Sequence, residues 1–550
     1  MDDTERTRTY LAGRITRRRM LQLTALGASS WVLQSLVGCG PSPSAPTTVA
    51  PQATVTQAPP QPTATKAPLQ PGKGGKLQIV VPSDITPKTL VNAISPTNAW
   101  VLGGVYETLT KYRVDRLEAQ PVLAESWQFS ADFSRITFKL RGDAKFHSGR
   151  PFTAADVKWN IERVADPKSA SQLLNLAKWV KQVDTPDNTT AVIQFDNPRP
   201  SALDLFENLL IADRESYQDS LDGKSFIGTG PFKFKEWVPG DHYTMVRNAE
   251  YRRADRPYLD EVNAKIVPDK QTQLINLQTS AADLGTNLEP RDLKGLMGDP
   301  KYQVIVPPVW GTMWGVGVDV KAPPFTDKRA RQAIAYLLDR KRIVDTLLFF
   351  EEPIQLPWPK SSPAYLDDLS ARYSYNFEKA KELWTQATGG ASVTVPITVS
   401  TSYPETFGIV DILQAELTKL GVKSSVEKLE HTQYLQKLSG AKFNGLWAGI
   451  YGWVNLTPST LFVQSFAFRV PNASNFDTPD YRQVVDATLN TTDPAELTKV
   501  YRKLDEILLD ECFTIPVASA GRPQGALASV KGITMSRDGI PMLGEYWKAA

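Results

Sequence analysis

The sequence has few of the side chains from which metal and redox sites are built. Its 550 residues include only two cysteines, Cys39 and Cys512, and three histidines, His147, His242 and His431. The histidines lie far apart and show no H-x-x-H or HExxH spacing, so we expect no metal site. Cys512, within LLDECFTIPV, lies among apolar residues and is predicted to be a small buried side chain.

The sequence also lacks the motifs of common enzyme classes. It contains no GxSxG nucleophile motif, no histidine in a triad context and no Walker phosphate-binding motif. An exported hydrolase, the enzymatic alternative, would need a nucleophile with its base or a pair of carboxylates. We therefore expect no catalytic residue, no cofactor and no enzymatic activity.

Extended basic runs and long apolar runs are absent after the N-terminal segment. Residues 1–38 carry six arginines and three acids, so removing this +3 from the net +3 of the chain leaves a charge of zero. A nucleic-acid partner would require a clustered basic surface that displaces counterions. After residue 75 no uncharged apolar stretch reaches the roughly 20 residues that cross a bilayer. These absences exclude nucleic-acid binding and a multi-span membrane protein.

The N-terminal segment has the pattern of an export signal. TRRRMLQL leads into an uncharged apolar run that ends at LVGC, residues 36–39. The arginines resemble a twin-arginine (Tat) signal, which favours that route over Sec, and LVGC resembles a lipobox. We predict a signal peptide over 1–38 and lipidation of Cys39, which would anchor the exported protein to the outer face of the membrane. A plain transmembrane anchor with a chance cysteine is the alternative.

The segment from 39 to 75 is predicted to be a disordered linker. It is rich in Pro, Ala, Thr and Gln, with almost no charge and no bulky aromatic side chain. Such a composition cannot bury enough apolar surface to offset its ordering entropy. With an extended polyproline geometry of about 3 Å per residue, it would hold a globular domain away from a lipid surface.

The remainder of the chain alternates between strand and helix patterns. KLQIVVP reads as a strand stopped by proline, and PFTDKRARQAIAYLL predicts a helix capped by Asp327. EKAKELWTQATGG predicts a helix that ends in glycines, and GIVDILQAELTKLG a helix closed by Gly421 before a strand. Alternation through both halves favours mixed α/β lobes.

One stretch, TFKLRGDAKFHSGRPFTAADVKW, mixes a histidine with lysines and glycines. Its first residues alternate as a strand with one apolar face, Gly142 and Asp143 indicate a turn, and Thr153 with Asp156 forms a capping-box pattern. Each unusual residue thus has a conformational role. We predict that His147 is structural, because no partner is evident that would orient it as a general base.

At these residues the chain resembles the extracellular solute-binding proteins of ABC importers, family 5, the oligopeptide, dipeptide and nickel-type binders. The resemblance covers essentially residue 76 to the C-terminus, in the usual order of motifs. Ser148 departs from it, since it replaces the common aspartate of FHDG. The matching segments are LAESWQFSADFSRITFKLRGDAKFHSGRPFTAADVKW, GTGPFKFKEW, NAEYRRADRPYLDEV, PFTDKRARQAIAYLLDRKRI, YSYNFEKAKELW and KVYRKLDEILLDECFTIPV.

The resemblance implies an α/β fold of the periplasmic-binding-protein type (type II, cluster C): a two-lobed clamp with an extra inserted domain. The implied first lobe is discontinuous and comprises 76–122, 226–308 and 510–550, with the inserted domain at 123–225. The second lobe is expected at 309–509. A solute would bind between lobes whose closure is driven by the ligand's preference for the closed state.

The candidate solute contacts come from the segment after a Gly-Trp strand end and from aromatic residues. Peptide-binding relatives have an aspartate shortly after a Gly-Trp strand end, which pairs with the peptide's amino group; YGWVNLTPSTLF offers Asn455 instead, and no acid occurs between Glu430 and Asp477. A buried ammonium without a countercharge is costly, which disfavours free peptides. The candidate ligand-binding residues are Trp453, Asn455, Tyr451, Trp100, Trp310 and Trp314.

Three classes of function follow from these patterns. The first is the substrate-binding lipoprotein of an ABC importer, which binds a peptide by family default, or else an oligosaccharide or other uncharged solute. Its partners would be a membrane permease with cytoplasmic ATPases and the membrane through its lipid; we expect a monomer. An exported hydrolase and a surface scaffold lipoprotein are the other two classes. The scaffold would have no reason for a hinged cleft, and the hydrolase would need a nucleophile with its base or paired carboxylates, which the sequence does not offer.

Overall fold

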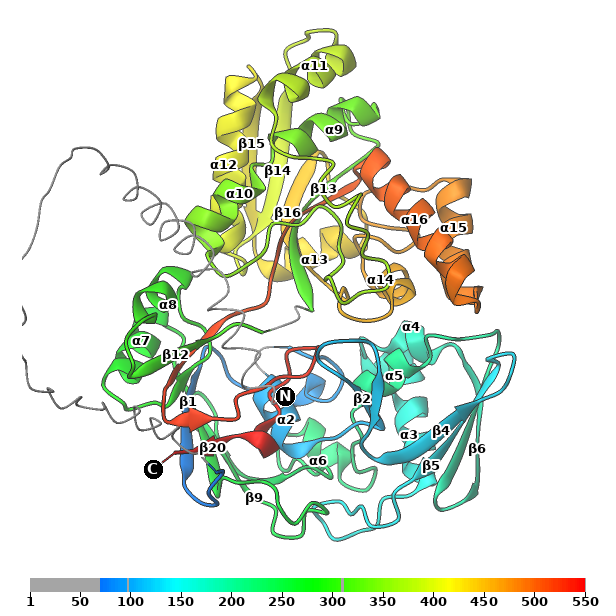
Figure 1. Cartoon of the computed structure of the whole chain (residues 1–550), viewed down its shortest axis with the longest axis vertical. Coiled ribbons are helices and arrows are strands. Elements are labelled where there is room, and N and C mark those ends of the chain that lie inside the picture. Colours follow the sequence, from blue (N-terminus) through cyan, green and yellow to red (C-terminus); the bar gives the residue numbers. More distant parts are fainter. Residues whose placement is uncertain (1–69, 96–97, 308–310, 550) are drawn as a thin grey trace, which may run out of the picture. The chain divides into compact units, whose positions relative to one another are not determined.

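The computed structural model describes residues 70–95, 98–307 and 311–549. They belong to one compact unit, Leu69–Ala550 (Figure 1). The predicted signal peptide, Cys39 and most of the predicted linker lie outside the described residues, and so does Trp310. None of the described helices is both long enough and apolar enough to span a bilayer.

The first lobe is built on a seven-stranded mixed sheet with the order β12-β18-β11-β1-β10-β9-β8. Central β1 pairs in parallel with β10 and β11, and its alternate residues fill a core that also includes Trp100 and Tyr546. The strands are β1 (Lys76–Val81), β8 (Phe232–Val238), β9 (His242–Arg247), β10 (Glu261–Ile266), β11 (Leu284–Gly285), β12 (Tyr302–Ile305) and β18 (Gln524–Leu527).

Short elements surround this sheet. Two further pairs of strands lie outside it, β2 with β3 and β19 with β20. The elements are η1 (Pro87–Thr89), α2 (Ala99–Val105), β2 (Thr110–Tyr112), β3 (Ala119–Pro121), α6 (Tyr217–Leu221), α7 (Lys270–Gln278), α8 (Pro290–Leu296), β19 (Val530–Lys531), η4 (Leu543–Glu545) and β20 (Trp547–Lys548).

A separate four-stranded antiparallel sheet, β4-β5-β7-β6, has its own core. Alternate residues of β5 are buried, as the sequence predicts. The capping box is confirmed: the Thr153 N–H donates to the Asp156 carboxylate at 2.9 Å where α3 begins. The elements are β4 (Ala124–Phe129), β5 (Arg135–Leu140), α3 (Ala154–Ala165), η2 (Pro167–Ser169), α4 (Leu174–Ala177), β6 (Val180–Asp187), β7 (Thr190–Phe195) and α5 (Leu203–Asn208).

His147 joins the loop between β5 and α3 to the segment that precedes β8. Its Nε2–H donates to the Gly230 carbonyl at 3.0 Å, while its Nδ1 accepts from the Gly228 N–H at 3.4 Å. Burial lowers the pKa of His147 to about 4, so the ring is neutral at pH 7. The structural role predicted for this histidine is confirmed.

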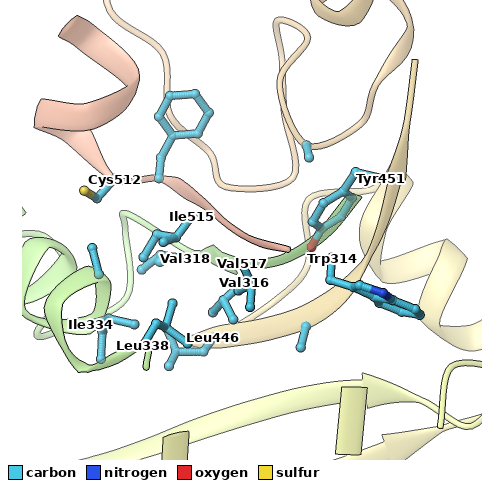
Figure 2. Packing of buried hydrophobic residues seen from close by; sticks show 14 of the residues in the cluster. Trp314, Val316, Val318, Ile334, Leu338, Leu446, Tyr451, Cys512, Ile515 and Val517 are labelled. Carbon is cyan, nitrogen blue, oxygen red and sulfur yellow. The ribbon is translucent and has the colours of Figure 1, made fainter. Parts of the chain in front are cut away.

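The second lobe is built on a five-stranded sheet with the order β15-β14-β16-β13-β17. Strand β14 is parallel to β15 and β16, whereas β13 runs antiparallel to both β16 and β17. The largest core cluster lies around this sheet (Figure 2). The strands are β13 (Thr312–Val318), β14 (Thr394–Ser400), β15 (Lys423–Leu429), β16 (Leu446–Gly452) and β17 (Thr514–Ser519).

The helices of the second lobe begin and end near the predicted signals. Asp327 caps α9, and Gly389 in the left-handed conformation ends α11. Cys512 is buried after the last helix, as predicted, and burial raises its pKa to about 11. The helices are α9 (Lys328–Leu337), α10 (Arg340–Ile343), η3 (Val344–Leu348), α11 (Phe377–Thr388), α12 (Glu405–Lys419), α13 (His431–Ser439), α14 (Pro458–Gln464), α15 (Pro479–Asn490) and α16 (Pro494–Glu511).

The chain passes between the two large sheets at two points. The first lies between β12 and β13, and the second between β17 and β18, where Figure 1 shows the orange-red ribbon running from one sheet to the other. The sequence-based prediction assigned residues 510–550, and with them β17, to the first lobe. In the structure β17 pairs with β13 of the second sheet. The return to the first lobe therefore occurs after Ser519.

Candidate functional site

Four parallel strands of the second sheet end at one edge. Strands β14, β15 and β16 run in the same direction, and β17 shares it because β16 and β17 are both antiparallel to β13. In open α/β sheets ligands bind beyond the carboxyl ends of such strands. We call this the carboxyl edge: the segments 401–404, 430–431, 453–457 and 520–523, which follow the four strands.

Trp453 is the first residue after β16 and has an unusual backbone. Its φ is +72°, in the left-handed region that side chains other than glycine seldom occupy. The partly buried indole packs against the core of the second lobe and also against the core around the four-stranded sheet. Backbone strain of this kind costs of order 1 kcal/mol and persists where the surroundings enforce it, often at ligand sites.

Asn455 is buried, and its side chain is already engaged. Its Nδ2 donates to the Arg537 carbonyl at 2.5 Å and to Asp538 Oδ1 at 2.9 Å. Arg537 in turn donates from Nε to the Asn455 carbonyl at 2.8 Å. The segment after β16 is therefore tied to the connection between β19 and β20, and the carboxamide serves this contact.

The other predicted aromatic residues differ in position. Tyr451 and Trp314 lie on neighbouring strands β16 and β13, at the end of the core away from Cys512 (Figure 2). Both are largely buried, and the Tyr451 hydroxyl has no hydrogen-bond partner among the described residues. Trp100 lies apart from them, in α2 of the first lobe, where it packs edge-on against Tyr546 at 6.3 Å.

Asp204 connects the two lobes from the α5 side. Its buried carboxylate accepts hydrogen bonds from the Thr457 N–H at 3.1 Å, the Thr457 hydroxyl at 3.0 Å and the Thr460 hydroxyl at 2.6 Å. Within its own lobe it accepts from the Tyr112 hydroxyl at 2.8 Å. A single carboxylate thereby fixes the start of α14 directly after the Trp453 segment.

Burial governs the charge in this region. Desolvation raises the pKa of Asp204 to about 6, against the opposing effect of its hydrogen bonds, of which the one from Thr460 is the largest. Desolvation likewise raises the pKa of the neighbouring Glu207 to about 8, although Lys111 at 3.5 Å opposes this. These two carboxyl groups are therefore partly protonated at neutral pH, and the α5 side of the interface carries less negative charge than two ionised carboxylates would.

Sequence reasoning missed the partners that the fold brings to this edge. Asp204 lies 253 residues from Thr457 in sequence, and Arg537 lies 82 residues from Asn455. No local pattern marks such contacts. Among the described residues no group of three or more His, Cys, Asp or Glu side chains is arranged to hold a metal ion.

The structure has two large sheets, between which the chain passes twice, and an additional four-stranded sheet. This is the architecture of a two-lobed solute-binding protein. The model of the bacterial extracellular solute-binding proteins, family 5 (middle), matches residues 118–469. The chain belongs to this family. Its members are binding proteins of transport systems and not enzymes, and this chain is accordingly the substrate-binding protein of an ABC importer.

Similar proteins support this assignment. Heme-binding protein A of Haemophilus influenzae is 27% identical over 471 residues, which is 78% of this chain and 84% of that protein. The glutathione-binding protein GsiB of Escherichia coli K12 is 26% identical over 416 residues, 73% of this chain and 80% of its own. The periplasmic binding protein DppA of Helicobacter pylori, solved with the peptide STSA, has a TM-score of 0.75 at 20% identity and covers 87% of this chain and 99% of its own.

Proposed function

We propose that the solute binds at the carboxyl edge of the second sheet and is enclosed by the first lobe. The observation that supports this most directly is the position of Trp453. It holds a strained conformation at a strand end and packs against the core of the second lobe and the core of the four-stranded sheet. Trp314 would form a wall beside it together with Tyr403, whereas Tyr451, which pairs with Met313, points to the opposite face of the sheet. We assign no solute contact to Trp100, because it lies within the core of the first lobe.

The proposed solute is a small organic molecule that need not carry an ammonium group. A peptide is the default for this family; two of the similar proteins are named for heme and glutathione, and the third was solved with a peptide. In this chain Asn455 is engaged with Arg537 and Asp538, and no acid occurs between Glu430 and Asp477. An uncharged solute such as an oligosaccharide is the second candidate, favoured by the aromatic wall.

The proposal includes the mode of attachment to the cell. LVGC, which ends at Cys39, and the twin-arginine pattern support export by the Tat route and a lipid anchor on the outer face of the membrane. The Pro- and Thr-rich segment would then act as a tether. We further propose that the protein acts as a monomer and delivers its solute to the membrane permease of the importer.

Replacing Trp453 with alanine tests the proposed site. We expect the Kd for the solute recovered from the purified protein to rise about 10- to 100-fold, because a large aromatic contact is lost at the edge. Isothermal titration calorimetry gives the Kd. Trp127→Ala is the matched control, since Trp127 lies on β4 and packs against the core of the four-stranded sheet. An unchanged Kd for Trp453→Ala would remove Trp453 from the site.

A further inference from the structure

Arg522 occupies the segment by which the chain returns from the second lobe to the first. The preceding residues are fixed: the Ala520 N–H donates to the Thr312 carbonyl at 3.0 Å, and the Gly521 N–H donates to the Glu351 carboxylate at 2.8 Å. Arg522 itself has a φ of +53° and precedes a proline. The crossing segment therefore holds this residue in an uncommon backbone conformation at the carboxyl edge.

The guanidinium of Arg522 has no hydrogen-bond or ion-pair partner among the described residues. The acids nearby are otherwise engaged. Glu351 accepts from the Ser519 hydroxyl at 2.6 Å as well as from Gly521, and Glu405 lies 3.6 Å from Lys270 across the two lobes. Arg522 is thus a cation that the fold positions without neutralising.

Arg522 is in contact with solvent and with the protein at once. Its side chain is exposed, yet the loss of water around it lowers its pKa, against the opposing effects of Tyr403, Glu405 and Glu351 in that order. Arg522 is therefore reached by solvent at a point where the protein displaces part of its hydration. A partly desolvated charge interacts more strongly with a ligand than a fully hydrated one does.

Aromatic side chains form the wall beside this cation. Tyr403 packs edge-on against Trp314, with ring centroids 6.5 Å apart, and against His431 at 5.2 Å. These residues follow or belong to three different strands of the second sheet. The sheet itself brings the crossing segment to this wall, because Ala518 of β17, four residues before Arg522, pairs with Trp314.

From this geometry we infer that Arg522 binds a carboxylate group of the solute, with the Tyr403–Trp314 wall alongside the solute's body. A guanidinium presents a planar pair of N–H donors that matches a carboxylate. Arg522 supplies one positive charge without a partner. It therefore matches a carboxylate, with one negative charge, better than a doubly charged phosphate. The inference rests on the proposed binding at the carboxyl edge and adds that the solute is an organic acid.

The test compares acids with their amides on wild-type protein and on Arg522→Gln. The probes are glutathione, N-acetyl-Ala-Ala, N-acetyl-Phe-Ala and succinate, each beside its carboxamide, measured by thermal shift and then by calorimetry. We expect at least one acid to bind wild-type protein at least about tenfold more tightly than its amide. Arg522→Gln should abolish this preference, whereas Arg522→Lys should retain part of it because the charge is kept.

Controls separate this inference from the proposed function. Arg502→Gln removes an exposed arginine that pairs with Asp368 at 2.8 Å, and it should leave the acid preference unchanged. All variants should unfold at the wild-type temperature without ligand. If no acid is preferred over its amide, or if the preference survives in Arg522→Gln, the inference is wrong. If the amides still bind and Trp453→Ala weakens their binding, the proposed site stands although the inference about Arg522 fails.

Discussion

Replacing Asp204 with alanine is expected to weaken solute binding about 10- to 100-fold, corresponding to the 1–3 kcal/mol that buried unpaired polar groups cost. Asp204 accepts three hydrogen bonds from Thr457 and Thr460 across the interface of the lobes. These bonds form only when the two lobes are in contact. Their loss therefore destabilises the closed state and lowers the affinity for the solute. Calorimetric titration of the solute into the variant and into wild-type protein measures the effect.

The same carboxyl group should make binding depend on pH. With its contacts to Thr457 and Thr460 made, the pKa of Asp204 is raised to about 6, so this arrangement of the lobes favours the protonated form relative to a solvated aspartate near 3.8. The resulting contribution is fully present below about pH 4 and is lost as the pH rises through about 6. Affinity should therefore fall between pH 5 and 7 in wild-type protein, and Asp204→Asn should remove this part of the dependence.

Asp219→Ala provides the control for the Asp204 variants. Asp219 is an exposed carboxylate on α6, 3.6 Å from Lys224, and makes no contact with the second lobe among the described residues. Its replacement should change neither the Kd nor the pH profile. If Asp204→Ala binds the solute as tightly as wild-type protein does, these interface hydrogen bonds have no role in closure.

Replacing Gly317 with alanine is expected to destabilise the second lobe strongly. An added Cβ would lie 2.1 Å from Cζ2 of Trp447, the residue that pairs with Gly317 across β13 and β16. Trp447 cannot move away easily, because it is fully buried and stacks on Phe443 with ring centroids 4.4 Å apart. Overpacking of this kind costs about 1–3 kcal/mol, occasionally more, and should lower Tm by several degrees.

Gly295→Ala is the matched control for this substitution. Gly295 lies inside α8, its added Cβ would meet no atom within 4 Å, and its φ is not in the left-handed region. Alanine is favoured over glycine in a helix by about 0.5–1 kcal/mol, so this variant should be as stable as wild-type protein or slightly more so. Differential scanning calorimetry compares the two. Equal melting temperatures for both variants would contradict the packing described around Trp447.

The sequence predicted the local structure well where a side chain acts on its own backbone. The caps at Thr153 and Asp327 and the glycine that ends α11 are local devices, and each is present. The structural role of His147 followed from the absence of partners that catalysis would need. These features depend on neighbours within a few residues, which a single sequence displays.

The site depends on contacts between distant parts of the chain, and these were not predictable from the sequence. Trp453 was identified because it is the tryptophan of a Gly-Trp strand end, but its contact with both cores needed the fold. Asp204 and Arg522 carry no motif. They matter because the fold buries one carboxylate against α14 and leaves one guanidinium without a partner. Whether Trp453, Asn455, Tyr451 and Trp314 contact a solute stays a prediction.

The central claim, that the lobes hold a solute without changing it, is tested most directly by mass spectrometry of what the protein carries. The purified full-length protein is dialysed and denatured, and the released small molecule is identified, returned to fresh protein and analysed again after prolonged incubation. We predict close to one molecule per chain, recovered chemically unchanged. Product formed in excess of the protein, or a chain that neither retains nor rebinds any small molecule, would contradict the account.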